Sequence, residues 1–217
     1  MIYLYAIAEG LTGLPEMRGV ADAPLDRLSV EGLDLVVSEH DGTDVAASEE
    51  AVLAHARVVE ALAERSEALL PARFGRGFRD ESALREAIRG RAGSLRDALA
   101  QVRGCVEIGV RVLAEEPAPQ PAIDSGRAYM EARLARNEET ERLARELHEP
   151  LAALARAGTR TVGATPRLLL SGAYLVEPDK LDAFRRRVGE LEAEHPRLTF
   201  VSTGPWPPYS FAPAGET

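Results

Sequence analysis

The chain has 217 residues, of which 45% are hydrophobic and 28% are charged, so a globally disordered protein is excluded. Its formal net charge of -9 provides no general basic surface, and we therefore expect no nucleic-acid partner. The single cysteine, Cys105, excludes both an internal disulfide and a metal cage built from cysteines.

The first half of the chain alternates short apolar runs with segments of helical period. Residues 2–8 and 33–37 are rich in residues that favour strands, whereas the apolar residues of 48–65 recur every three or four positions, as in a helix. Pro71 predicts that its strand lies at an edge or ends there. The expected elements are strands at 2–8, 33–37, 68–74 and 106–113, and helices at 48–65 and from Asp80 or Ser82 to Gly104.

A proline-rich segment separates the two halves. Residues 115–121 read Glu-Glu-Pro-Ala-Pro-Gln-Pro, and three prolines at alternate positions favour a stiff, extended connector. We place a domain boundary in this segment. The sequence therefore predicts an N-terminal domain at residues 1–116 and a C-terminal domain at residues 117–217.

The second half opens with a long helical pattern at 125–157, in which Pro150 is expected to kink or divide the helix. Its middle carries alternating charges, which are typical of a solvated helix face, although its arginines also offer a site for an acidic partner. Pro196 ends the helix that follows. The further elements expected are strands at 159–164, 167–176 and 198–202 and a helix at 177–194.

Strands and helices alternate without a regular βα repeat, which favours an α+β fold with helices packed on one face of mainly antiparallel sheets. Each half is compatible with a variant of the ferredoxin-like split βαβ arrangement. The C-terminal half is expected to combine one long helix with a small antiparallel sheet.

Signatures of catalysis or of cofactor binding are missing from the sequence. The segment Gly75-Arg76-Gly77 lacks the further glycine and the Gly-Lys-Ser/Thr run of a phosphate-binding loop. No local pattern exposes a nucleophile, and no carboxylate lies in a distinctive apolar setting. The four histidines are far apart in sequence and do not form a metal-binding pattern: His40, His55, His148 and His195. We therefore expect a protein that is not an enzyme and that needs no cofactor and no metal.

Targeting segments are also missing from the sequence. The segment 1–9 has no positively charged region and is too short for the apolar core of a signal peptide. No apolar run approaches the roughly 18 residues that are needed to span a bilayer. The expectation is a cytoplasmic protein that does not bind membranes.

Three stretches of the sequence resemble the GvpL/GvpF gas vesicle family. The first is Tyr3-Leu4-Tyr5-Ala6-Ile7, and the second is Leu70-Pro71-Ala72-Arg73-Phe74-Gly75, which is similar to the family's Pro-x-Arg-Phe-Gly segment. The third and most specific is Gly204-Pro205-Trp206-Pro207-Pro208-Tyr209-Ser210-Phe211, close to the family's Gly-Pro-Trp-Pro-Pro-Tyr-x-Phe ending. Together they extend over nearly the whole chain. Arg76 is a departure, because the family often carries a small polar residue such as threonine there.

The resemblance implies a ferredoxin-like N-terminal domain, an α+β C-terminal domain and an accessory or minor structural role in gas vesicle assembly. It implies contact with the small hydrophobic shell protein or with other accessory gas vesicle proteins. The alternative that stays open is a regulatory module that binds a small ligand on a ferredoxin-like scaffold. The residues of the two longer motifs that are candidates for partner contact are Arg73, Phe74, Gly75, Gly204, Pro205, Trp206, Pro207, Pro208, Tyr209 and Phe211.

Two interpretations of the C-terminal motif follow from its composition. Its prolines restrict the backbone, and its three aromatic side chains offer large apolar surfaces. In the first interpretation the segment folds back on its own sheet and completes the core. In the second it presents an exposed aromatic patch to a partner.

Overall fold

The computed structural model describes residues 1–42, 44–115, 126–163 and 167–213. They form two compact units, one made of Met1–Cys105 with the C-terminal residues from Trp206 onward and the other of Val106–Pro205. The division after Cys105 differs from the expected boundary at 116/117, because the strand that begins at Val106 pairs within the sheet of the second unit. Most of the proline-rich connector lies outside the described residues.

The first unit contains a mainly four-stranded antiparallel sheet with a short fifth strand. The strand order is β2-β3-β1-β4, and β5 pairs with the start of β1. Its strands are β1 (Ile2–Glu9), β2 (Asp26–Val30), β3 (Leu33–Glu39), β4 (Ala68–Pro71) and β5 (Gly77–Phe78). Glu31 and Gly32 join β2 to β3 in a two-residue turn with φ of 53° and 77°, the backbone that a tight hairpin requires.

Three α-helices belong to this unit, and two short 3-10 turns, η1 (Val20–Asp22) and η3 (Tyr209–Phe211), accompany them. The side chain of Ser48 accepts a hydrogen bond from the Ala51 N–H at the start of α1, and Asp80 does the same for Ala83 at the start of α2. The helices are α1 (Glu49–Ala63), α2 (Glu81–Arg89) and α3 (Ala92–Val102). The single helix expected from Asp80 to Gly104 is instead two helices, because the backbone leaves the helical conformation at Arg91, where φ is -126° and ψ is 7°.

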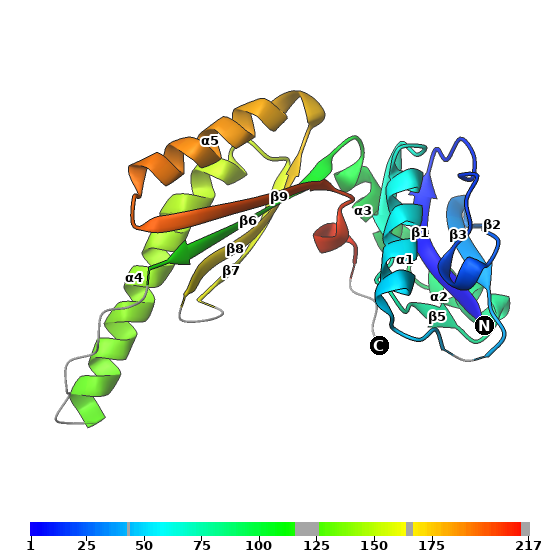
Figure 1. Cartoon of the computed structure of the whole chain (residues 1–217), viewed down its shortest axis with the longest axis horizontal. Helices are drawn as coiled ribbons and strands as arrows, with labels where there is room; N and C mark the ends of the chain where they lie inside the picture. Colours follow the sequence, from blue (N-terminus) through cyan, green and yellow to red (C-terminus); the bar gives the residue numbers. More distant parts are fainter. Residues whose placement is uncertain (43, 116–125, 164–166, 214–217) are drawn as a thin grey trace. The chain divides into compact units, whose positions relative to one another are not determined.

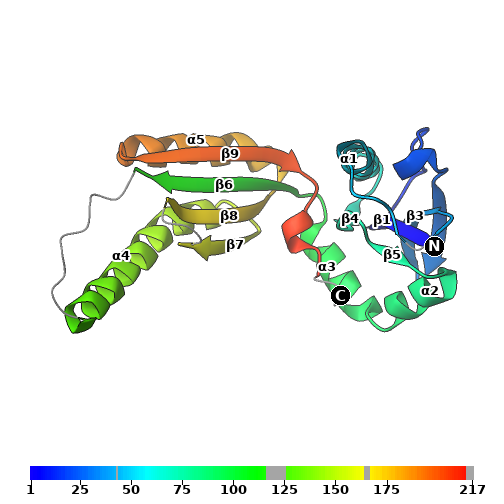
Figure 2. The same ribbon diagram turned by 60° about the horizontal axis from the view of Figure 1, so that its bottom comes forward.

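Helices cover both faces of the first sheet (Figures 1 and 2). Tyr3 and Tyr5 of β1 pack with α1 on one face, whereas Leu4 and Ile7 face the side of α2 and α3. The expectation that helices lie on one face is thus wrong for this unit. The helix α1 crosses from β3 to β4 with β1 between them, which is the split βαβ arrangement.

The second unit contains a four-stranded sheet in the order β7-β8-β6-β9. Its strands are β6 (Val106–Ala114), β7 (Ala157–Val162), β8 (Leu168–Val176) and β9 (Leu198–Trp206). The strand β8 pairs antiparallel with both β6 and β7. The Glu115 N–H bonds to the Arg197 carbonyl, and Gly109 lies against Thr203, so β9 also runs antiparallel to β6.

Two helices, α4 (Gly126–Ala152) and α5 (Leu181–Glu194), pack on one face of this sheet, and the 3-10 turn η2 (Pro178–Lys180) precedes α5. The helix α4 continues through Pro150 to Ala152. This proline therefore does not divide the helix and lies within its last turn. The core under these helices is mainly aliphatic and includes Tyr174 and Phe184, both fully buried. The α+β class predicted from the sequence, with mainly antiparallel sheets, is confirmed.

Candidate functional site

The loop that follows β4 carries the Pro-Ala-Arg-Phe-Gly motif. Both ends of the loop are tied to β1, because the Ala72 N–H bonds to the Tyr5 carbonyl at 2.8 Å and the Leu4 N–H bonds to the Arg76 carbonyl at 2.9 Å. Gly75 closes the loop with φ of 84°, a conformation that favours glycine. The motif is therefore held as a defined loop over the first sheet.

A chain of buried hydrogen bonds connects this loop to β1 and α1. The Tyr3 hydroxyl accepts a hydrogen bond from the Gly75 N–H at 3.1 Å and lies 3.0 Å from Nδ1 of His55. The Nε2 atom of His55 lies 3.0 Å from the Ala72 carbonyl oxygen, which can only accept. The arrangement requires the His55 tautomer that carries its proton on Nε2, with the Tyr3 hydroxyl donating to Nδ1. One histidine thus joins β1, α1 and both sides of the motif loop.

A second chain of polar groups lies beside the first. The Tyr5 hydroxyl accepts a hydrogen bond from the Val20 N–H at 2.8 Å and lies 2.9 Å from the Ser38 hydroxyl, which lies 2.8 Å from Nε2 of His40. Burial raises the pKa of Tyr5 above its ordinary value, and it raises the pKa of Tyr3 to about 12. Both tyrosines therefore remain neutral hydrogen-bonding groups at physiological pH.

Acidification is expected to destabilise the first unit through His55. Burial lowers the pKa of this imidazole below its ordinary value of 6.5, so the unfolded chain binds a proton more readily than the folded chain does. The contribution of neutral His55 to stability is complete above pH 6.5 and is lost progressively as the pH falls below that value. Thermal unfolding between pH 7.5 and pH 5 checks this: the melting temperature of the wild type should fall more steeply than that of His55→Gln. Equal slopes of melting temperature against pH would contradict the role of His55. Burial also lowers the pKa values of His40 and His148, and these two histidines contribute to the slope of both proteins alike.

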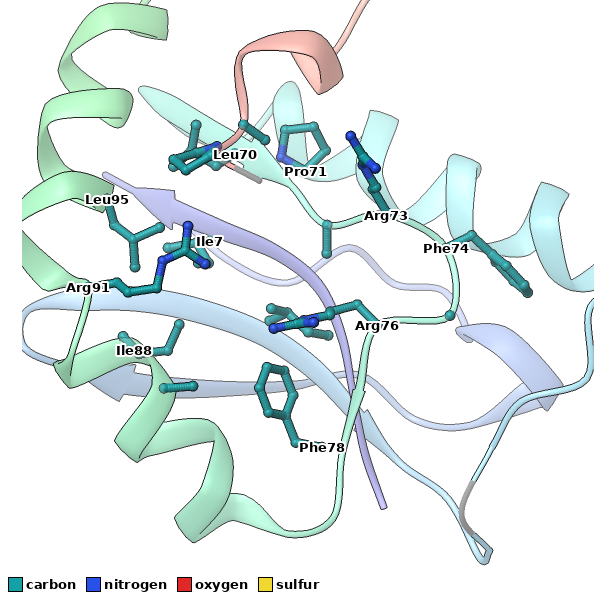
Figure 3. A pocket seen from close by; sticks show the side chains of 16 residues that line it. Ile7, Leu70, Pro71, Arg73, Phe74, Arg76, Phe78, Ile88, Arg91 and Leu95 are labelled. Carbon is teal, nitrogen blue, oxygen red and sulfur yellow. The ribbon is translucent and has the colours of Figure 1, made fainter. Parts of the chain in front are cut away.

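A pocket opens on the opposite face of the same loop, with a volume of about 260 Å³. Figure 3 shows the side chains of Arg76 and Arg91 extending into it from opposite sides, Arg73 at its rim, and Phe74 pointing away from it. Phe74 instead packs beside Tyr3. The apolar lining residues are Leu4, Ile7, Leu70, Pro71, Ala72, Phe74, Phe78, Ala87, Ile88, Leu95, Ala212 and Pro213.

The C-terminal motif is divided between exposed and packed residues. Trp206, at the end of β9, is 47% exposed. Pro208 is buried, and Tyr209 packs against the core of the first unit, where burial raises its pKa to about 12. Pro207 and Phe211 are half-buried, whereas Gly204 and Pro205 are exposed. The motif therefore combines a packed anchor with an exposed tryptophan.

Sequence reasoning named the motif loop but missed most of what surrounds it. In the sequence His55 is one of four histidines that lie far apart, and no local pattern distinguishes Arg91 from the other arginines. Within the ranges that the structure describes, no group of three or more His, Cys, Asp or Glu side chains is placed to hold a metal ion. No helix in those same ranges is long and apolar enough to cross a membrane.

Comparison with known proteins places the chain in a family. Residues 1–213 match the family "Gas vesicle synthesis protein GvpL/GvpF". The chain is 35% identical to gas vesicle protein F2 of Halobacterium salinarum, over 97% of this chain and 91% of that protein. It is 34% identical to gas vesicle protein L of a Streptomyces species, over 77% of this chain and 70% of that protein.

The fold is also similar to that of a solved relative. The crystal structure of gas vesicle protein GvpF from Anabaena sp. superposes with a TM-score of 0.79 at 20% identity, covering 99% of this chain and 97% of that one. This likeness supports the arrangement of helices and sheets described above. Since the family match covers nearly the whole chain and a relative above 30% identity is covered almost completely, the protein belongs to the GvpL/GvpF family of gas vesicle proteins.

Proposed function

We propose that the protein is a non-enzymatic accessory or minor structural protein of gas vesicle assembly. It would act in the cytoplasm, associated with the gas vesicle, and contact the small hydrophobic shell protein or other accessory gas vesicle proteins. Membership of the family supports the general role. The observation that supports direct protein contact is the exposed tryptophan at the end of an uncharged outer strand.

The strand β9 has the features of a protein-binding edge. It is one of the two edge strands of its sheet, and its sequence Leu-Thr-Phe-Val-Ser-Thr-Gly-Pro-Trp contains no charged residue. Natural edge strands usually carry charges that prevent association. Val201 and Trp206 of this strand are 40% and 47% exposed, and tryptophan is enriched among residues that dominate binding energy at interfaces. A partner that covers Trp206 would remove this apolar surface from water.

Co-expression with the gas vesicle shell protein tests the proposal. Wild type should co-purify with the shell protein, and Trp206→Ala should weaken capture by about 2 kcal/mol or more, roughly 30-fold, as expected for a central tryptophan. Because Trp206 is exposed, its replacement should change the free energy of unfolding by no more than about 0.5 kcal/mol. Affinity measured by titration and stability measured by chemical denaturation provide the two readouts.

Val52→Ala is the matched control, because Val52 is an apolar side chain that is exposed to 44% but lies on α1 and not on β9. It should leave capture unchanged. Equal capture by wild type and Trp206→Ala would show that the tryptophan is not the contact. If the wild type itself fails to capture the shell protein, direct shell contact loses its support, and the other accessory proteins become the partners to test.

A further inference from the structure

We infer that the open edge of β9 binds an extended, uncharged segment of a partner protein, which adds to the sheet as a further β-strand. The backbone of residues 200–204 forms the binding edge, and it lies wholly within the second unit. The inference rests on the proposed function for the kind of partner and deepens it by assigning how the partner is held. Backbone groups make this contact, so it is distinct from the contact of the Trp206 side chain.

The hydrogen bonds between β9 and β6 determine which backbone groups of β9 face the open edge. The Glu115 N–H donates to the Arg197 carbonyl oxygen, so the backbone groups of Arg197 point towards β6. Gly109 lies against the Thr203 side chain, which is the pair that the same register predicts. In an antiparallel strand this direction alternates from one residue to the next. The odd-numbered residues from Arg197 to Thr203 therefore point towards β6, and the even-numbered residues point away from it.

Two hydrogen bonds of even-numbered residues agree with this register. The Leu198 N–H donates to the His195 carbonyl oxygen, and the Phe200 N–H donates to a carboxylate oxygen of Glu192 at 3.3 Å. Neither acceptor lies on β6. The sheet order ends at β9, so no strand within the described residues pairs with the outward groups that follow (Figure 2). These groups are the carbonyl oxygen of Phe200, the N–H and carbonyl oxygen of Ser202 and the N–H of Gly204.

The spacing of these outward groups matches one kind of occupant. Ser202 can exchange both of its hydrogen bonds with a single residue of an antiparallel strand, whereas the outward groups of Phe200 and Gly204 meet the residues two positions to either side. An α-helix cannot serve, because its own backbone groups are already bonded to one another. A segment of about five residues in extended conformation uses every outward group, which is the mode of recognition by strand addition.

Charge distinguishes β9 from the other strands that end the two sheets. The strand β2 carries Asp26 and Arg27, β7 carries Arg160, and β4 is buried along its whole length. Within the described residues β9 is thus the one such strand that is both uncharged and open to solvent, since residues 201–206 are all exposed. Charges on an edge strand normally prevent another strand from pairing with it. The edge of β9 has no such protection.

The lack of charge also defines the chemistry of the partner segment. A charged side chain placed opposite β9 would lose water without meeting a charge on that strand, which is unfavourable. Uncharged residues that favour strands, such as valine and threonine, fit the edge best. The Glu192 carboxylate already occupies the Phe200 N–H, so the added strand extends from Phe200 towards Trp206 at the end of β9.

Nuclear magnetic resonance of the isotopically labelled full chain, titrated with the peptide acetyl-Thr-Val-Thr-Val-Thr-amide, tests the inference. We expect saturable binding, with hydrogen exchange at the amides of Ser202 and Gly204 slowed at least tenfold. The amides of Val201 and Thr203, which face β6, should change far less. A peptide whose central threonine is replaced by lysine should bind at least fivefold more weakly, although the net charge of the chain is negative.

Variants of Ser202 test the edge itself. Ser202→Pro removes the outward N–H without removing a bond to β6, so it should abolish peptide binding and weaken capture of the shell protein at least tenfold. Circular dichroism and thermal unfolding should stay close to those of wild type. Ser202→Ala, which keeps every backbone group, is the matched control and should bind the peptide as wild type does.

A charged variant tests the same edge with its backbone groups intact. Ser202→Lys places a charge on the strand, in the manner of natural edge strands, and should weaken peptide binding at least fivefold. It keeps the inference testable if the proline variant is unstable. Peptide binding that persists in both Ser202→Pro and Ser202→Lys would overturn the inference.

Other results separate strand addition from the proposed function. Failure of the peptide to bind, with capture of the shell protein intact, would sink strand addition and leave the proposed function standing. Peptide binding that is lost in Ser202→Pro, with no capture of the shell protein, would remove shell contact and keep β9 as a binding edge. A dimer of this chain that Ser202→Pro dissociates, seen by analytical ultracentrifugation without peptide binding, would make a second copy the occupant and overturn the inference.

Discussion

Replacement of His55 by leucine is expected to lower the free energy of unfolding of the first unit by about 2–5 kcal/mol. The imidazole is 3% exposed and bridges the Tyr3 hydroxyl and the Ala72 carbonyl oxygen. Its loss leaves the Tyr3 hydroxyl without an acceptor for its proton and the Ala72 carbonyl oxygen without the His55 donor. A buried polar group that loses its partner costs about 1–3 kcal/mol. Urea denaturation, followed by far-ultraviolet circular dichroism, measures the difference.

The partner of His55 supplies the control for this prediction. Tyr3→Phe removes the hydroxyl that the leucine variant leaves without an acceptor, so the double variant should be more stable than the sum of the two single effects predicts. A coupling energy near zero, or a cost of His55→Leu below about 0.5 kcal/mol, would contradict the role of the histidine as a buried bridge. The Gly75 N–H, which loses its acceptor in Tyr3→Phe, keeps that single variant destabilised.

Phe184→Ala is expected to destabilise the second unit by about 3–5 kcal/mol, which is the usual cost of truncating a buried phenylalanine. Phe184 is fully buried on α5, and its ring lies 5.2 Å from that of Tyr174 on β8. The cavity would lie under the one layer of helices that covers this sheet. Hydrogen exchange followed by mass spectrometry should show faster exchange in peptides from β6 and β8.

Peptides from β1 and β3 provide the internal reference, because these strands belong to the core of the first unit. Their exchange should change far less than that of β8. Leu134→Ala on α4 is the matched surface variant, since Leu134 is 58% exposed, and it should shift stability by less than about 0.5 kcal/mol. Equal acceleration in both units would show that they unfold as one cooperative block.

Elements with strong periodicity were predictable, and those that depend on long-range pairing were not. The strand β1 and the helix α1 were expected within a residue or two of their bounds, because their apolar spacing is regular. The strand β2 was missed because its Asp-Arg-Leu-Ser-Val sequence is short, partly charged and exposed at a sheet edge. The assignment of β6 to the second unit depends on pairing with β8, which is more than 50 residues away.

In the candidate site, too, the motifs formed by neighbouring residues were predictable, whereas the contacts between residues far apart in sequence were not. The motif loop is recognisable from Arg73-Phe74-Gly75 alone, but nothing in the residue pattern indicates that Phe74 and Arg76 lie on opposite faces of it. Arg91 lines the pocket at the break between α2 and α3, and the apolar spacing of the sequence did not predict this break. In the C-terminal motif, the two interpretations apply to different residues, since Tyr209 packs inward and Trp206 is exposed.

The return of the chain to the first unit at Trp206 has a consequence for how the protein is made. A ribosome completes residues 1–105 long before it reaches Tyr209. The whole of Val106–Pro205 must therefore be synthesised before Tyr209 can pack against the core of the first unit. Because β6 and β9 are antiparallel neighbours, the two points where the chain enters and leaves the second unit lie at the same end of its sheet. The second unit is thus a nested module, replaceable in principle by a short turn that joins Cys105 directly to Trp206.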